Sequence, residues 1–279
     1  MDLSCREEPA TATCDRTIFG DPRVVVQMLR DEVLYMPKCN YFTEVQTDIQ
    51  PFMRKVVTTW MVEVCEEQSC EDQVLPLAIN LMDRFLCECD IKRQQFQLLA
   101  ATCLLIASKM RSTNFLPVDL LCAYTDYSVS YDHIVAWEQL VLSKLSWNIA
   151  SITGFDYIDH IIERSSWGHE STLIRRHAHT LVHVCYTEPA LVQAPPSLIA
   201  GACLSSAIRG LKLPSAEIAV ADICRMINLL PSKVDFLVSF VDNAVAKAAP
   251  SSPQHPPPKG YESPQYGPDT PTEVEDIYF

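Results

Sequence analysis

A short segment in the middle of the chain is apolar on every side, and this limits the folds open to the protein more than any other feature. The segment from Leu98 to Ala107 reads LLAATCLLIA and carries no charge. A helix of this kind has no face suited to water, so it is expected at the centre of a bundle with other helices around it. The sequence therefore predicts a helical bundle with a central helix over residues 98–107.

A second segment of the same kind follows one hundred residues later, as LIAGACLSSA from Leu198 to Ala207. The two segments match at Leu98/Leu198, Ala100/Ala200, Cys103/Cys203, Leu104/Leu204 and Ala107/Ala207. Small residues at corresponding positions let neighbouring helix axes approach closely. The period exceeds that of solenoid repeats. We therefore expect a duplicated helical domain.

Length and charge narrow the possible functions. A chain of 279 residues is long enough for two cores, and its 7 glycines are too few for a turn-rich sheet protein. The net charge of −13 opposes the phosphate backbone, so no nucleic-acid partner is expected. No segment is long and apolar enough to span a bilayer, so no membrane partner is expected either.

The 12 cysteines do not indicate a disulfide scaffold or a metal site. No basic-then-apolar leader is present, so we expect reduced thiols, most of them packed as small hydrophobes in helices. No CxxC pair occurs, and His179 and His183, although four residues apart, have no third ligand. We expect neither a metal nor another cofactor. Without a phosphate-binding or kinase catalytic motif, the chain is not expected to be an enzyme.

The apolar spacing divides the chain into five parts. Residues 1–20 and 249–279 are polar or Pro-rich and are predicted to be disordered tails. Residues 21–49 hold an amphipathic helix, Asp21 to Tyr35, and a connection. Residues 50–152 form a first bundle and residues 153–248 a second, with Thr153 as the N-cap of its first helix. The helices expected in the second bundle are Phe155 to Arg164, Glu170 to Tyr186, Ser197 to Leu211, Ala216 to Asn228 and Ser232 to Ala248.

Two charged residues of the first bundle need a partner. Glu138 lies on an apolar stripe of the helix Ser130 to Leu145, and Lys109 ends the central helix. One interpretation is an internal ion pair between them, with Lys109 also favoured by the helix dipole. The other is a charged pair presented to a partner protein. The residues alone leave both interpretations open.

Four segments resemble the cyclin box of D-type cyclins: MRKVVTTWMVEVCEEQ, LPLAINLMDRFL, QLLAATCLLIASKM and LSKLSWNIA. The resemblance implies an all-α fold of two tandem five-helix boxes. It also implies a regulatory subunit that activates a G1 cyclin-dependent serine/threonine kinase and directs phosphorylation of retinoblastoma-family proteins at the G1/S transition. Lys109 and Glu138 correspond to the family's kinase-binding lysine and glutamate.

The resemblance also implies a docking patch for linear motifs of substrates and kinase-inhibitor proteins. Its residues are Met53, Val57, Trp60, Glu63, Phe96 and Gln97, and Phe96 replaces the family's usual leucine. The alternative for Trp60 is a core position. A cyclin-box scaffold or a transcription-associated adaptor that activates no kinase remains the alternative function.

The tails carry two short motifs. Leu3, Cys5 and Glu7 form an LxCxE pattern whose alternate residues share one face when extended, and its position matches the family's peptide for a retinoblastoma-family pocket protein. Thr270 precedes a proline and resembles the family site whose phosphorylation recruits a ubiquitin ligase. The family is expected in nucleus and cytoplasm, although no basic cluster supplies an import signal.

Overall fold

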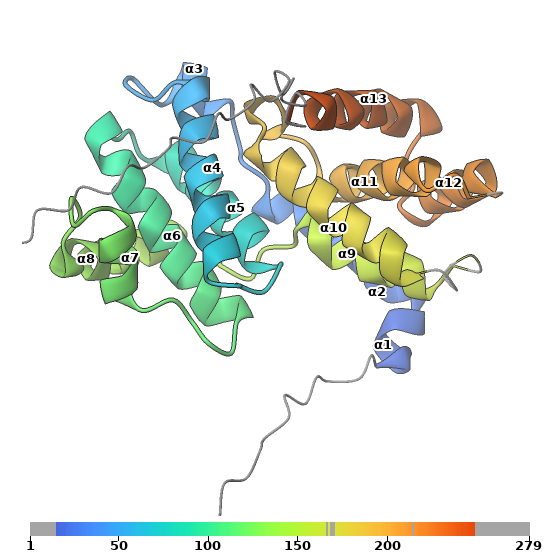
Figure 1. Cartoon of the computed structure of the whole chain (residues 1–279), viewed down its shortest axis with the longest axis horizontal. Coiled ribbons are helices and arrows are strands. Elements are labelled where there is room, and N and C mark those ends of the chain that lie inside the picture. The colour runs from blue at the N-terminus through green and yellow to red at the C-terminus, as the bar shows by residue number, and fades with distance from the viewer. Residues whose placement is uncertain (1–14, 166, 168–170, 214, 249–279) are drawn as a thin grey trace, which may run out of the picture.

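The computed structural model describes residues 15–165, 167, 171–213 and 215–248. Within these ranges every regular element is a helix, so the all-α prediction is confirmed. The helices form two bundles that lie side by side (Figure 1). In the same ranges no helix has the length and apolarity needed to cross a membrane.

The first bundle is built around the helix that the sequence places at its centre. That helix is α6, Phe96–Arg111, and it contacts all four of its companions. Its residues from Leu98 to Ser108 are all buried, as expected of a helix without a polar face. The surrounding helices are α4 (Pro51–Glu67), α5 (Val74–Glu88), α7 (Val118–Tyr124) and α8 (Tyr131–Lys144).

The second bundle repeats this plan around α11, Pro196–Gly210. The small residues of α11 allow neighbouring helices to approach closely. A Cβ added to Gly201 would lie 2.6 Å from Cδ1 of Ile227, which is closer than a Cβ and a neighbouring carbon normally approach. The duplication predicted from the two apolar segments is therefore present in the structure. The helices around α11 are α9 (Gly154–Glu163), α10 (Ser171–Thr187), α12 (Ala216–Met226) and α13 (Pro231–Ala248).

The helix ends follow local sequence signals. Thr153 is the N-cap of α9 as predicted, and its N–H and hydroxyl both donate to Oδ2 of Asp156 at 2.7 and 2.9 Å. The helix expected up to Asn228 stops at Met226, because Asn228 takes a positive φ of 51°. The segment expected as one helix from Asp21 divides into α2 (Pro22–Asp31) and a 3₁₀ turn, η1 (Glu32–Tyr35).

The prediction of a disordered tail over residues 1–20 is wrong for residues 16–20, which precede α2. Arg16–Gly20 form a short helix, α1, whose N-cap Asp15 accepts a hydrogen bond from the N–H of Thr17 at 2.9 Å. Phe19 stacks on His160 of α9, with ring centroids 4.5 Å apart. The two aromatic residues are far apart in the sequence, so the polarity of residues 1–20 could not predict their contact. The other residues of the predicted tails, 1–14 and 249–279, lie outside the described residues. Between η1 and α4 lies one short helix, α3 (Tyr41–Glu44).

A buried carboxylate joins the N-terminal segment to the second bundle. Both side-chain oxygens of Glu32, which is 6 % exposed, accept hydrogen bonds from Ser197: one from its N–H at 2.9 Å and one from its hydroxyl at 2.8 Å. Ser197 is in the first turn of α11, where backbone N–H groups lack partners within the helix and the helix dipole favours an anion. Glu32 therefore caps a helix that is distant in sequence.

We expect Glu32→Ala to lower the free energy of unfolding by about 1–3 kcal/mol, because a buried N–H and a hydroxyl lose their acceptor. Urea unfolding followed by circular dichroism measures the change. In a double-mutant cycle with Ser197→Ala, the two effects should be less than additive. Full additivity would contradict the capping role.

A buried ion pair of the first bundle also reaches the second bundle through a hydrogen bond. Arg54 donates to Asp83 of α5 from Nε and Nη2 at 2.9 and 2.8 Å, and Nη2 also donates to the carbonyl oxygen of Tyr186 at 2.9 Å. The Tyr41 hydroxyl donates to Oδ1 of Asp83 at 2.8 Å. The side chains of Arg54 and Asp83 are 1 % and 5 % exposed, so this network lies in the interior at the junction of the bundles.

Candidate functional site

The structure brings Lys109 and Glu138 together on the surface of the first bundle. Lys109 lies in the last turn of α6, and Glu138 lies in the middle of α8, which packs against α6. Nζ of Lys109 donates to Oε1 of Glu138 at 2.6 Å. The apolar stripe around Glu138 is packed inward, with Ile134 and Val141 fully buried. The stripe therefore fixes α8 so that Glu138 faces the end of α6.

The exposure of this pair bears on both interpretations of its role. The side chain of Lys109 is 41 % exposed and that of Glu138 is 18 % exposed. A pair in contact with solvent stabilises a fold by only about 0–1 kcal/mol, because water screens it and side-chain entropy opposes it. The apolar side chains of Met110 and Phe115, one and six residues after Lys109, are exposed as well. Charged groups beside exposed apolar side chains are typical of a protein-binding surface.

A second surface feature is an apolar groove of about 600 Å³ formed by α4 and the start of α6. Five of the six residues predicted for the docking patch line it: Met53, Val57, Trp60, Phe96 and Gln97. The sequence missed four other lining residues, Phe52, Val56, Arg93 and Gln94. Val56 is 65 % exposed and lies three residues after Met53, on the side of α4 that faces the groove.

Glu63 does not line the groove. It is exposed on α4, and the helical rotation of 100° per residue places it within about 20° of Val56, seven residues earlier, on the same side of the helix. Glu63 therefore lies about two turns further along α4, beyond the residues that line the groove. Charge at the groove comes instead from Arg93, whose N–H donates to Asp48 at 3.0 Å.

Trp60 both packs against the core and lines the groove. Its ring is half-buried and packs against the core, and its indole N–H donates to the carbonyl oxygen of Tyr124 at 3.3 Å. The same side chain lines the groove. Substitution of Trp60 would change stability and the groove together, so Val56 is the better probe of the groove.

His179 and His183 meet Asp72 of the first bundle. Nδ1 of His179 lies 3.5 Å from Oδ2 of Asp72, and Nε2 of His183 lies 2.9 Å from the carbonyl oxygen of Asp72. Among the residues that the structure describes, no group of three or more His, Cys, Asp or Glu side chains is placed to hold a metal ion. These histidines therefore contribute to the contact between the bundles.

Two predicted motifs lie outside the described residues: the LxCxE residues Leu3, Cys5 and Glu7, and Thr270. Their roles stay predictions.

Comparison with known proteins now identifies the fold. The N-terminal cyclin domain matches residues 23–150 and the C-terminal cyclin domain matches residues 152–267. A G1/S-specific cyclin-D3 of Bos taurus is 36 % identical over the whole of both chains. The chain belongs to the D-type cyclin family. A cyclin-D2 of Gallus gallus is 43 % identical over 77 % of this cyclin and 75 % of the relative, and the human cyclin-D3 is 41 % identical over 76 % and 74 %.

Solved structures share the fold of this cyclin. A viral cyclin from herpesvirus saimiri superposes with a TM-score of 0.70 at 22 % identity, covering 81 % of this chain and 98 % of the viral one. A chain of the CAK complex from Chaetomium thermophilum superposes with a TM-score of 0.52 at 16 % identity, covering 83 % and 72 %. The two bundles are therefore cyclin boxes, the first over α4–α8 and the second over α9–α13.

Proposed function

We propose that this cyclin binds and activates a G1 cyclin-dependent serine/threonine kinase through the surface around Lys109 and Glu138. One observation carries the proposal: the ion pair between α6 and α8 is exposed, in the first box, at the positions that correspond to the family's kinase-binding lysine and glutamate. Its relatives are G1/S-specific D-type cyclins, which favours a kinase of the G1 phase. The chain is proposed to be a regulatory subunit and not an enzyme.

The mechanism is a change in the kinase's conformation. The first box packs against the mobile C-helix of the kinase and helps to seat the lysine–glutamate pair that phosphoryl transfer requires. The central position of α6 suits this role, because a helix held by four neighbours presents Lys109 in a fixed place. ATP, magnesium and the catalytic aspartates belong to the kinase.

The tails are proposed to control substrate choice and lifetime. Leu3, Cys5 and Glu7 tether a retinoblastoma-family pocket protein and raise its local concentration at the kinase. Phosphorylation of Thr270 adds up to about two negative charges, which a ubiquitin ligase recognises. The protein is proposed to act in both nucleus and cytoplasm.

The test is to mix the purified full chain with G1 cyclin-dependent kinases and to measure phosphorylation of a retinoblastoma fragment. Complex formation together with a large increase in phosphorylation is expected. Binding without any increase would favour the alternative of a scaffold, and absence of binding to every G1 kinase would overturn the proposal.

The groove of α4 and α6 is proposed to dock short Arg-x-Leu motifs of substrates and kinase-inhibitor proteins. We expect Val56→Ser to weaken binding of such a peptide about tenfold, because burying a valine contributes about 1.5 kcal/mol or more. Fluorescence anisotropy of a labelled peptide measures the affinity. Val33, which is 66 % exposed on η1 and does not line the groove, supplies a matched control. Equal effects of Val56→Ser and Val33→Ser would exclude the groove as the peptide site.

A further inference from the structure

The end of helix α4 brings two cysteines together. After Glu67 the chain turns through Ser69, whose φ is 48°, in the left-handed region. The N–H of Ser69 donates to the carbonyl oxygen of Glu66 at 3.1 Å, and the N–H of Cys70 donates to the carbonyl oxygen of Cys65 at 2.9 Å. This pair of bonds defines a Schellman cap, which brings the residues three before and two after the helix end close together and frequently places their side chains in contact. Here those residues are Cys65 and Cys70.

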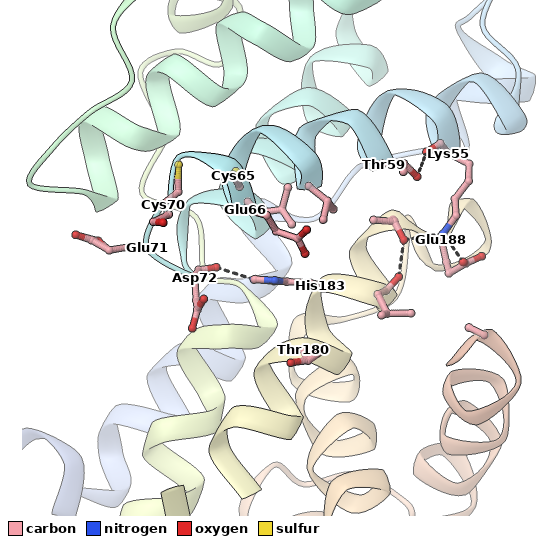
Figure 2. A pocket seen from close by; sticks show the side chains of 16 residues that line it. Lys55, Thr59, Cys65, Glu66, Cys70, Glu71, Asp72, Thr180, His183 and Glu188 are labelled. Carbon is pink, nitrogen blue, oxygen red and sulfur yellow. Dashed lines mark hydrogen bonds and ion pairs between the residues drawn. The ribbon is translucent and has the colours of Figure 1, made fainter. Parts of the chain in front are cut away.

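The two thiols differ in their access to solvent. Both line a cavity of about 520 Å³ between the two boxes, bounded by α4, the loop after it and α10 (Figure 2). Cys65 is buried at 9 % exposure, whereas Cys70 is half-buried at the edge of the cavity. A small reagent in the cavity can therefore reach Cys70 more easily than Cys65.

The surrounding groups favour the thiolate at Cys70. A hydrogen bond from the Cys65 thiol lowers the pKa of Cys70, outweighing burial and the charge of Glu71, which raise it. The same hydrogen bond, together with burial, raises the pKa of Cys65. The thiolate is the reactive form of cysteine, so Cys70, the more accessible member of the pair, is also the more reactive one.

We propose that Cys70 and Cys65 form an oxidisable dithiol that reacts with a small hydroperoxide entering the cavity between the boxes. The Cys70 thiolate attacks one peroxide oxygen, so that a sulfur–oxygen bond forms and the oxygen–oxygen bond breaks. The released hydroxide takes up a proton and leaves as water when the reagent is hydrogen peroxide. The Cys65 sulfur then attacks the sulfenic sulfur of Cys70, and the second oxygen leaves as water with the Cys65 proton. The peroxide is reduced by two electrons, and the two thiols are oxidised to one disulfide.

The disulfide would restrict the loop that makes a contact between the two boxes. Asp72, two residues after Cys70, meets both His179 and His183 of α10. Figure 2 shows Cys70 and Asp72 on the loop after α4, with His183 of α10 reaching toward Asp72. A Cys65–Cys70 bridge ties the loop that carries Asp72 to the end of α4, so oxidation reduces the freedom of that loop and of the contact that it makes.

The test treats the folded full-length chain with hydrogen peroxide, blocks the remaining thiols and cleaves the chain after glutamate. Glu66 and Glu67 lie between the two cysteines, so cleavage separates them into peptides that stay joined only through a disulfide. Mass spectrometry is expected to find the joined peptides. Cys70→Ser should abolish them and leave Cys65 reduced, and Cys65→Ser should leave Cys70 as a sulfenic acid that a cyclic diketone traps.

A second cysteine pair in the same chain supplies the matched control. The sulfurs of Cys185 and Cys203 lie 3.6 Å apart, but both residues are buried at 1 % and 0 % exposure. If proximity of the two sulfurs were enough for oxidation, this pair would be oxidised as readily as Cys65 and Cys70. If access from the cavity is required, this pair should stay reduced in the folded protein. Oxidation of both pairs at one rate, or a Cys65–Cys70 pair that stays reduced until urea unfolds the chain, would overturn the proposal.

Discussion

Arg54→Ala is expected to lower the free energy of unfolding by about 3–5 kcal/mol, because it leaves the carboxylate of Asp83 buried without its partner. Although burial opposes the charged form, Asp83 raises the pKa of Arg54 above its usual range, so the guanidinium stays charged in the folded protein. The loss is a large part of the 5–15 kcal/mol that is typical of a folded domain.

The effect should extend to the junction of the boxes. Arg54 also donates to the carbonyl oxygen of Tyr186, at the end of α10, so alanine removes a hydrogen bond between the first and second box. Unfolding of the variant should therefore begin with separation of the boxes. Amide hydrogen exchange would show this as faster exchange at the ends of α4 and α10 than in the centres of α6 and α11.

A surface arginine supplies the control for Arg54. Arg175 pairs with Asp159 and Glu163 at 2.6 and 3.0 Å, but its side chain is 32 % exposed. Arg175→Ala should cost no more than about 1 kcal/mol. Urea denaturation of both variants measures the difference, and similar losses would contradict the importance of burial.

A double substitution separates charge burial from packing. Arg54→Met combined with Asp83→Leu removes both charges and should be more stable than Arg54→Ala. Recovery should be incomplete, since the Tyr41 hydroxyl and the Tyr186 carbonyl oxygen lose their partners. A double variant less stable than Arg54→Ala would show that the Arg54–Asp83 pair is not what stabilises this junction.

The backbone architecture was predictable from the sequence because apolar periodicity is a local signal. The central helices α6 and α11 are recognisable from segments that lack a polar face, and Thr153 from a capping box within four residues. The Arg54–Asp83 pair was not predictable. Its partners are 29 residues apart, and a lone arginine on a helix is normally a surface residue. Only the tertiary fold shows that Arg54 faces inward.

The functional surfaces were predictable to different degrees. Lys109 and Glu138 were identified because a carboxylate on an apolar stripe requires a partner, and the resemblance assigned them a role. The groove was found only in part, because Arg93 and Gln94 come from the turn before α6, which has no periodic pattern. The Cys65–Cys70 pair was missed. Cys65 belongs to an apolar helix, and its contact with Cys70 depends on the positive φ of Ser69, at a position where glycine is usual.

The largest expected functional effect is that of Lys109→Glu, which should abolish activation of the kinase. The substitution removes a cation and places two carboxylates side by side at the proposed interface. Loss of a charge pair that a partner desolvates weakens binding by about 2–5 kcal/mol, which corresponds to roughly 30-fold to several-thousand-fold. Stability should change by about 1 kcal/mol or less, because the pair is in contact with solvent. Kinase assays and urea denaturation measure the two effects separately.

Exchanging the charges distinguishes a partner-binding role from an internal one. Lys109→Glu combined with Glu138→Lys restores an ion pair between α6 and α8, because the two side chains still lie within reach of each other. If the pair only stabilises the packing of α6 on α8, the double variant should activate the kinase as the original chain does. If Lys109 and Glu138 bind fixed groups on the kinase, each new charge faces the wrong partner, and the double variant should regain stability without regaining activation. We expect the second result. Because the side chain of Lys109 is 41 % exposed, the pair contributes little to the stability of the fold, and its outer face is open to another protein.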